Sequence, residues 1–312
     1  MGAVILDDEE LRLTYISALK APSARDLQIK VGASDLSNSC DRCLAHRLLG
    51  NVIVNPRSGA AWLKAEIGNG IHARSQDKIE MLRDDPFHAN LKGSHAERHL
   101  VFGHIDGYGD VGGSIDWDMP LRGQGVDFKG SDQVSSALLM DALLEAGDDR
   151  YGAETRFKRG ARGGWNLVIR GKGKITCHMS DAEYAAAKAD MLHKYEKYRA
   201  QQTLYMRGLE LEGVTVHKWS IMWLHRDGTG FYDNPANPSF SDPTKARDIW
   251  VLSFNYDRDY ALALIQRAQG IWDRLSAGGS PADFSQDPQC FSCQYELEQE
   301  MRGLDIEASM AH

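Results

Sequence analysis

Apolar residues recur at helical spacing in several long segments of the chain, and short alternating runs lie between them. The segments with helical spacing are residues 9–20, 34–49, 60–84, 180–208 and 257–275. The runs that predict strands are residues 97–102, 113–118, 126–129, 219–224 and 250–254. Ser34 and Asp35 are the expected N-caps of their helix. Glycine-rich turns between the first three strands favour an antiparallel meander, so the order of elements predicts one mixed α/β domain with a central sheet.

Composition limits the class of protein. The chain has 312 residues, of which 42% are hydrophobic, so it can bury a sizeable core. No apolar run approaches the roughly 18 residues of a membrane span, and no basic segment opens a signal peptide. We therefore expect a cytoplasmic protein without membrane contact. The net charge of −8 argues against a protein that coats nucleic acid, but it allows an enzyme with a basic cleft.

Four of the five cysteines form two Cys-x-x-Cys pairs at opposite ends of the chain, Cys40 with Cys43 and Cys290 with Cys293. A disulfide framework is not expected in a cytoplasmic chain. Four thiolates instead indicate a structural zinc ion or a cubane iron–sulfur cluster, and ligand count does not separate the two. Two incidental or redox-active pairs are the remaining alternative. Cys177 has no thiol partner by spacing and is interpreted as a small buried residue.

The third predicted strand carries Asp127 and Lys129, which are two positions apart and therefore share one face. Asp116 precedes them at hairpin spacing, so a turn over residues 122–125 would bring the two carboxylates together. Two converging carboxylates suit Mg²⁺ or Mn²⁺, and the ammonium can polarise a water or stabilise a transition state. A surface ion pair is the alternative interpretation of the Asp-x-Lys sequence.

Two helices add candidates to this site. His72 lies on the helix before the strands, where it is either a structural residue or a third metal ligand. Tyr198, Gln201 and Tyr205 fall near one face of the later helix. A glutamine beside a metal site can hold a scissile phosphate or the attacking water.

Two carboxylates remain ambiguous. Asp106 also satisfies a Gly-x-x-Asp pattern, but its use would need a longer loop and would leave the strand over residues 114–118 unexplained, so Asp116 is preferred. Glu97, on the first strand, is either a ligand to a second ion or a surface residue.

Residues 155–174 differ from the rest of the chain because they hold seven basic residues, five glycines and no acid. A solvated flexible loop would explain this composition. A loop that contacts DNA would also explain it, with charges for phosphates and rings for stacking on bases. The candidate DNA contacts are Arg156, Lys158, Arg159, Arg162 and Trp165.

The patterns Gly-x-x-x-His, Gly-x-x-Asp, Asp-x-Lys and Tyr-x-x-Gln occur in this order and end at His72, Asp116, Lys129 and Gln201. They resemble the RecB-like branch of the PD-(D/E)xK nuclease superfamily. With cysteines at both ends, the chain is similar to the iron–sulfur nucleases, the fourth CRISPR-associated exonuclease family and its relatives encoded by actinobacterial phages. The segments that carry this resemblance are Cys40–Ala45, Glu97–Val101, Gly107–Asp116, Val126–Lys129 and Arg226–Gly228.

The resemblance spans residues 34–294. It implies a restriction-endonuclease-like α/β core, with a central mixed β-sheet flanked by helices and a metal-cluster region that joins the N- and C-terminal segments. Residues 1–33 would then be an N-terminal extension, residues 130–190 an insertion that contains the basic loop, and residues 295–312 a C-terminal tail.

The activity that the resemblance implies is metal-dependent hydrolysis of phosphodiester bonds at single-stranded or duplex ends of DNA. The Mg²⁺ or Mn²⁺ ligands would be His72, Asp116 and Asp127, with the carbonyl of Phe128 as a further donor. Lys129 would orient the nucleophile or stabilise the transition state. Gln201 and Tyr198 would position the substrate.

The resemblance favours a 4Fe-4S cluster over zinc. Relatives have one N-terminal and three C-terminal cysteines, whereas this chain has two and two, and this leaves zinc as an alternative. The expected role is phage DNA recombination or replication in the bacterial host cytoplasm, alongside recombination or replication proteins. The alternatives are an end-trimming nuclease for CRISPR spacer capture, a DNA-binding protein without catalytic activity, and a scaffold held together by zinc. The intact Asp-x-Lys sequence argues against a loss of catalytic activity.

Overall fold

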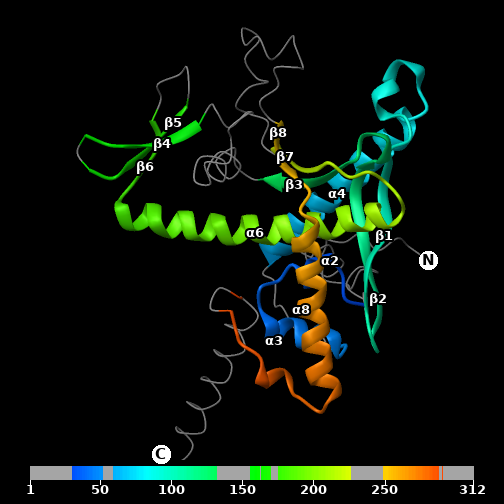
Figure 1. Cartoon of the computed structure of the whole chain (residues 1–312). Helices are drawn as coiled ribbons and strands as arrows, with labels where there is room; N and C mark the ends of the chain where they lie inside the picture. Colours follow the sequence, from blue (N-terminus) through cyan, green and yellow to red (C-terminus); the bar gives the residue numbers. More distant parts are fainter. Residues whose placement is uncertain are drawn as a thin grey trace, which may run out of the picture.

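In the computed structural model, a five-stranded sheet of strand order β1-β2-β3-β7-β8 lies at the centre of the protein (Figure 1). Its strands are β1 (His95–Ile105), β2 (Gly109–Met119), β3 (Gln124–Ser131), β7 (Lys218–His225) and β8 (Ile249–Asn255). Strands β3 and β7 pair in parallel, and the other neighbours are antiparallel. The structure describes residues 30–51, 59–131, 155–161, 163–169, 175–225, 249–287 and 290.

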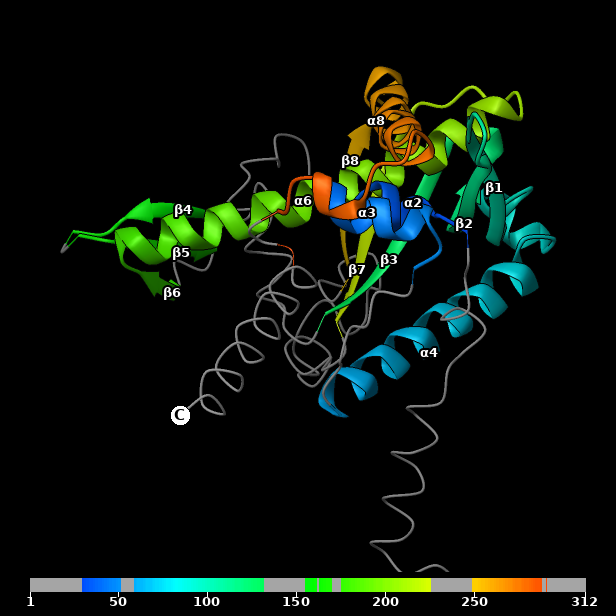
Figure 2. The ribbon, with the colours of Figure 1, turned by 90° about the horizontal axis from the view of Figure 1, so that it is seen from below.

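Helices cover both faces of this sheet. Figure 2 shows α4 (Gly59–Leu82) on one side and α6 (Asp181–Leu211) with α8 (Arg258–Ser276) on the other. Two short helices, α2 (Ala33–Leu36) and α3 (Asp41–Leu48), pack on the α6 and α8 side. The 3-10 helices are η1 (Pro86–Leu91), η2 (Pro120–Arg122) and η5 (Pro281–Asp283). The protein is therefore a mixed α/β structure with a central mixed sheet flanked by helices.

The main core lies between the sheet and α6. Trp219 of β7, Leu100 of β1 and Leu204 of α6 are almost fully buried there. Burial of each such side chain contributes about 1.5–3 kcal/mol. Gly125 of β3 allows α6 to approach the sheet closely, because a Cβ at this position would overlap the side chain of Met206. The register of α6 over the site is thus fixed by close packing.

A smaller apolar cluster fixes α4 on the opposite face. Ile79 of α4 packs with Val126 and Phe128 of β3. This contact sets the position of α4 beneath β3, and with it the position of His72, which lies seven residues before Ile79 on the same helical stripe.

The predicted meander of three antiparallel strands is confirmed, as are the later strands and the three long helices. The turn between β2 and β3 ends at Gly123, which has φ of 56°. A side chain there would collide with the backbone oxygen of Thr215, so both the backbone conformation and the space require glycine.

The single helix predicted over residues 34–49 is wrong, because the chain forms two short helices, α2 and α3. Cys40 is the N-cap of α3, and its Sγ accepts a hydrogen bond from the backbone N–H of Cys43 at 3.5 Å. Ser34 and Asp35 are not N-caps but lie inside α2. The break places the first cysteine pair at the start of a helix.

The loop predicted over residues 155–174 is wrong for most of the part that the structure describes, which forms strands. Residues Thr155–Arg159 form β4 and Trp165–Ile169 form β5, and with β6 (Ile175–Met179) they make a three-stranded antiparallel sheet. Arg156 and Lys158 alternate with Thr155 and Phe157 along most of β4, which suits a strand, and the glycines supply the turn. This sheet, here called the β4–β6 arm, lies at the N-terminal end of α6, away from the central sheet (Figures 1 and 2).

Several expectations fall on residues that the structure does not describe. They are the helix over 9–20, the Arg226–Gly228 segment, Arg162, Cys293 and the C-terminal tail. Within the described residues, no helix combines the length and apolar character needed to cross a membrane.

Candidate active site

The candidate site lies where β2 and β3 separate. Paired positions between them end at Trp117 with Val126. Beyond this point the Asp116 carboxylate lies between the strands, where its Oδ2 accepts a hydrogen bond from the backbone N–H of Phe128 at 2.7 Å. On its other edge, β3 pairs with β7 along its whole length. This separation makes room for a polar site inside an otherwise continuous sheet.

Three side chains from three elements converge at this point. His72 Nδ1 of α4 lies 3.4 Å from Asp116 Oδ1 and 3.6 Å from Glu97 Oε1 of β1. One ligand atom from each residue lies within 4.8 Å of the others, a group that could hold a metal ion. Imidazole and carboxylate donors suit Mn²⁺, and carboxylates suit Mg²⁺.

Glu97 has an unusual backbone. It is a non-glycine residue with a positive φ, 51°. Its neighbours Ala96 and Arg98 pair with Trp117 and Ile115, so Glu97 lies opposite Asp116 across the strand pair. A left-handed conformation is costly for glutamate, and such positions are concentrated at functional sites. The geometry therefore favours a ligand over a simple surface residue.

Asp127 and Lys129 lie beside this group on the α6 side of β3. Lys129 Nζ is 2.6 Å from Asp127 Oδ2 and 5.1 Å from the ring centroid of Tyr198. Asp127 is 3% exposed and the Lys129 side chain is 23% exposed, so this ion pair is largely buried and is not a surface pair. The ammonium is held on one side by a carboxylate and on another by an aromatic face.

Charged neighbours and burial shift the pKa values of the site's titratable groups. The Asp116 and Glu97 carboxylates raise the pKa of His72 to about 9. Burial opposes ionisation of Asp116, but His72 and Lys129 outweigh it and lower the Asp116 pKa. Burial raises the pKa of Asp127 to about 6, against the opposing charge of Lys129. Burial and the neighbouring cations therefore shift the pKa values of the two carboxylates in opposite directions, a pattern that is common at functional sites.

The competing aspartate lies elsewhere. Asp106 is at the tip of the β1–β2 hairpin, where its side chain is 92% exposed and its backbone N–H donates to Gln269 Oε1 at 2.7 Å. Asp116 is 8% exposed and contacts His72. The structure therefore brings Asp116, the aspartate that hairpin spacing favours, next to His72.

Asp116→Asn should remove metal-dependent activity, whereas Asp106→Asn should leave it near the wild-type level. Asn keeps the shape of Asp116 but removes the charge that would hold a cation. Turnover of end-labelled DNA by the two folded variants measures the difference. The opposite result would assign the site to the hairpin tip.

Tyr205 of α6 lies on the helix face that sequence spacing predicted for Tyr198 and Gln201, although the sequence assigned it no chemical role. Its hydroxyl accepts a hydrogen bond from Gln201 Nε2 at 3.5 Å. Burial raises its pKa to about 12, so the phenol stays protonated. Its signal in the sequence is the i, i+4 relation to Gln201. Gln201 and Tyr198 lie on the same helix above Asp127 and Lys129.

A separate buried acid lies two residues beyond Asp116. Asp118 is fully buried, and its carboxylate contacts Arg98 at 2.8 Å and His95 at 3.2 Å. Burial raises its pKa. Because cationic partners compensate Asp118, this cluster is a structural ion-pair group and not part of the candidate metal site.

Cysteines from both ends of the chain also converge. Cys40, Cys43 and Cys290 are buried, and their sulfurs lie within 4.8 Å of one another. The Sγ atoms of Cys43 and Cys290 are 3.3 Å apart. Cys293 lies outside the described residues. Three thiols at this spacing could hold a metal, as the two Cys-x-x-Cys pairs predicted.

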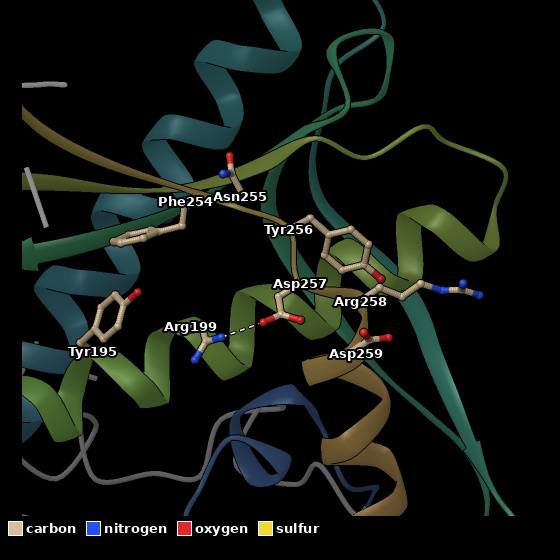
Figure 3. Close-up of a pocket in the computed structure, with 8 residues that line it drawn as sticks. All are labelled: Tyr195, Arg199, Phe254, Asn255, Tyr256, Asp257, Arg258 and Asp259. Atoms are coloured by element: carbon tan, nitrogen blue, oxygen red, sulfur yellow. Dashed lines mark hydrogen bonds and ion pairs between the residues drawn. The ribbon is translucent and has the colours of Figure 1, made fainter. Parts of the chain in front are cut away.

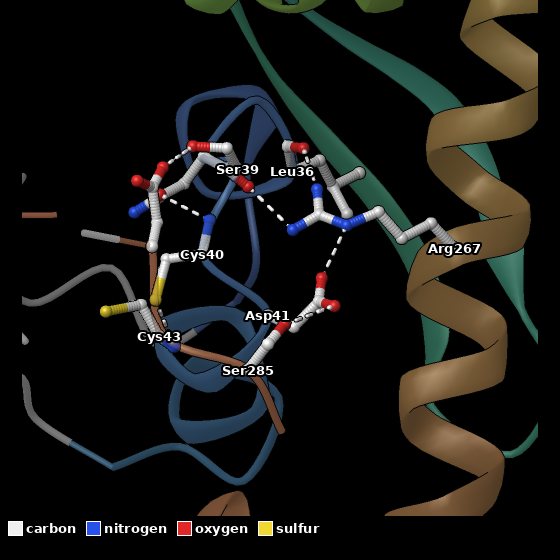
Figure 4. Close-up of polar contacts among 9 residues, drawn as sticks. Leu36, Ser39, Cys40, Asp41, Cys43, Arg267 and Ser285 are labelled. Carbon is white, nitrogen blue, oxygen red and sulfur yellow. Dashed lines mark hydrogen bonds and ion pairs between the residues drawn. The ribbon is translucent and has the colours of Figure 1, made fainter. Parts of the chain in front are cut away.

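Arg267 of α8 holds the chain around the first cysteine pair (Figure 4). Its guanidinium donates to the backbone oxygens of Leu36 and Asn38 and to Asp41 Oδ1, at 3.3, 2.8 and 2.7 Å. Arg42 reaches the C-terminal segment and donates to the backbone oxygen of Ala282 at 3.2 Å. Protein contacts therefore position both segments next to the thiols.

The candidate DNA-contact residues of the β4–β6 arm divide into two groups. Arg159 forms an ion pair with Asp181 of α6, and Trp165 donates to the same carboxylate at 3.0 Å while it stacks on Tyr184 at 4.2 Å. These two residues fasten the arm to α6. Lys158 is exposed. Arg156 lies on β4, and Arg162 is outside the described residues.

Neutralising Arg156, Lys158, Arg159 and Arg162 should weaken DNA binding. The slope of log affinity against log salt concentration should become less steep by up to about 0.7 for each charge removed, when the DNA is single-stranded. Arg159 should contribute least, because Asp181 already neutralises it. Affinity measured over a range of salt concentrations tests this. Arg83→Ala with Lys92→Ala, near η1, is the control, and an unchanged slope in the arm variant would leave the arm a structural connector.

An open pocket of about 520 Å³ lies between α6, the end of β8 and the start of α8 (Figure 3). Arg199 there is paired with Asp257 at 2.8 Å, and Arg258 with Glu210 at 3.3 Å. Its charges are balanced within the protein, and we assign it no function.

A scan against protein-family models matches none of them, and no curated protein matches the sequence. Among solved structures, SSO0001 aligns over 85% of this chain and 85% of its own, with 12% identity and a TM-score of 0.36. A phage-related exonuclease from Haemophilus somnus 129PT aligns over 80% of this chain and 96% of its own, with 13% identity and a TM-score of 0.31. Likenesses this distant carry no argument about the function of this protein. The function is therefore inferred from the geometry of its own residues.

Proposed function

We propose that this protein is a divalent-metal-dependent deoxyribonuclease of the PD-(D/E)xK type that degrades DNA from an end. The observation that carries the proposal is the convergence of His72, Glu97 and Asp116 within 4.8 Å beside a buried Asp127–Lys129 pair. The same residues carry the sequence resemblance to RecB-like nucleases. Site geometry and sequence pattern therefore support one chemistry.

The donor set fits Mg²⁺ or Mn²⁺. His72 Nδ1 is buried without a hydrogen-bond partner among the described residues, although two carboxylates face it. His72, Asp116 and Asp127 would hold the ion, with Glu97 as a further carboxylate. When bound, the ion would neutralise phosphate charge and lower the pKa of a coordinated water.

Residues of the chain would perform the remaining tasks. Lys129 would donate hydrogen bonds to the scissile phosphate or the attacking water, and its burial would strengthen that contact. Asp127 opposes the burial effect and raises the Lys129 pKa, so the ammonium stays charged. Tyr198 limits the movement of Lys129, and Gln201, held by Tyr205, would position the substrate.

Metal binding should release a proton. His72, with a pKa of about 9, is protonated at neutral pH in the metal-free protein, and only the neutral imidazole is a ligand. Apparent Mn²⁺ affinity should therefore rise about tenfold per pH unit from about pH 7 to about pH 8.5 and then level off. Below about pH 6, protonation of Asp127 should steepen the dependence. Mn²⁺ titration across this range would contradict the ligand role of His72 if the affinity did not change.

End-labelled linear DNA and closed circular DNA, incubated with the protein and Mg²⁺ or Mn²⁺, test the proposed function. Progressive loss of the linear strands with the circle intact is the expected result, and a chelator should prevent it. Trimming of only a few nucleotides would favour the spacer-capture alternative. Binding without cutting would indicate a silent DNA-binding protein, and neither binding nor cutting would leave a metal-stapled scaffold.

The remaining parts of the proposal concern the rest of the chain. The nuclease domain would occupy residues 34–294, with residues 130–190 as an insertion that contacts DNA through the β4–β6 arm. The cysteine centre would hold a 4Fe-4S cluster, with zinc as the alternative. The cellular role would be phage DNA recombination or replication inside the bacterial host.

A further inference from the structure

Helix α4 carries two glycines at mid-length, Gly68 and Gly70. Glycine weakens a helix interior relative to alanine. A Cβ built at either position would meet no heavy atom of the described residues within 4 Å. Crowding by this part of the protein therefore does not explain the choice of glycine at either position.

The two glycines face different directions. Gly68 lies one turn before His72 and on the same stripe, whereas Gly70 is about 200° around the helix from His72. Gly68 is half-buried and Gly70 is exposed. Further along that stripe, Ile79 packs tightly against Val126 and Phe128.

The sheet-facing stripe of α4 therefore changes character along its length. It is packed at Ile79, which is 7% exposed, and carries the candidate metal ligand at His72. At Gly68 it has open space among the described residues. The space lies one helical turn, about 5.4 Å along the helix axis, before His72.

We propose that the backbone of α4 at Gly68 is the surface over which the DNA strand reaches the metal site, in contact with the nucleotide next to the scissile phosphate. The inference rests on the proposed function. A residue without a side chain lets a sugar–phosphate backbone approach the helix closely. Any side chain at Gly68 would occupy the space that this nucleotide needs, whereas a side chain at Gly70 would point away from it.

Gly68→Ala and Gly70→Ala form a matched pair for the test. Both changes should raise the midpoint of thermal unfolding, because alanine favours the helix at each position. Only Gly68→Ala should raise KM for a single-stranded oligonucleotide, by about tenfold or more, since small displacements at a reacting centre have large effects. Gly68→Met should raise KM further, and Gly70→Met should not. Mn²⁺ affinity, measured without DNA, should match the wild type in all four variants.

Each alternative outcome is distinguishable. A Gly68→Ala protein with unchanged KM, beside an active wild type, would overturn the inference and leave the nuclease proposal intact. Weaker Mn²⁺ binding in Gly68→Ala would also overturn it, because the alanine would then act by displacing His72. A wild-type protein that does not cut DNA would refute the proposed function, and the inference with it.

Discussion

Asp127→Ala and Lys129→Ala should each reduce DNA hydrolysis by about a hundredfold or more, which corresponds to several kcal/mol of barrier. The first change removes a carboxylate from the proposed metal site, and the second removes the cation that is proposed to face the phosphate. Both side chains lie on one face of β3, 2.6 Å apart at their charged atoms. Steady-state turnover of end-labelled DNA at saturating Mg²⁺ measures the loss.

Folding must be separated from chemistry in this experiment. Removing one partner of a buried pair leaves the other charge uncompensated, which by itself destabilises a protein by about 3–5 kcal/mol. Asp127→Asn and Lys129→Met keep the volume of each side chain, and thermal unfolding monitors their stability. The exposed Asp77 and Lys188, replaced by alanine, are the matched controls and should retain activity. Wild-type turnover by folded Asp127→Asn or Lys129→Met would refute the site.

Cys43→Ser should release the metal of the cysteine centre and lower the stability and solubility of the protein before it affects the nuclease chemistry. Cys43 and Cys290 come from segments at opposite ends of the chain, and their sulfurs are 3.3 Å apart. A metal that joins them closes a very long loop, so metal binding becomes folding free energy. The candidate active-site residues lie on α4, β1, β2, β3 and α6, and their geometry should persist in the folded fraction.

Iron, zinc and acid-labile sulfide per chain, measured in protein purified without oxygen, test the cysteine centre. About four irons and four sulfides would support the cluster, and one zinc without sulfide would support the alternative. Cys177→Ser, on β6, is the control and should keep the metal. A stable protein that contains neither metal, and that tolerates the loss of Cys40, Cys43, Cys290 and Cys293, would remove the centre from the proposal.

Local periodicity determined much of this protein. The strand period of two placed Asp127 and Lys129 on one face, and the glycine-rich turns indicated the hairpin that brings Asp116 near them. Apolar residues at helical spacing defined α4, α6 and α8, because each helix must bury one stripe. These signals are readable in sequence because they depend on neighbours within a few positions.

In two segments the local sequence pattern predicted the wrong secondary structure. Helical spacing runs through residues 34–49, yet the chain breaks so that Cys40 can cap α3. Glycine and basic residues suggested a loop at residues 155–174, yet alternation along β4 and pairing with β5 produced strands. A helix cap in the first segment and strand pairing in the second outweighed the propensities for one helix and for a loop.

The site itself required the tertiary structure. The sequence determined which residue types were present and which shared a face, but not which faces meet. His72 reaches Asp116 only because Ile79 packs α4 beneath β3, and Glu97 joins them through a left-handed backbone that strand periodicity does not predict. The pairing of β2 with β3 ends at Trp117 with Val126, and beyond it the Asp116 carboxylate accepts the backbone N–H of Phe128. Such contacts depend on the close packing of whole elements, and short sequence patterns carry no record of it.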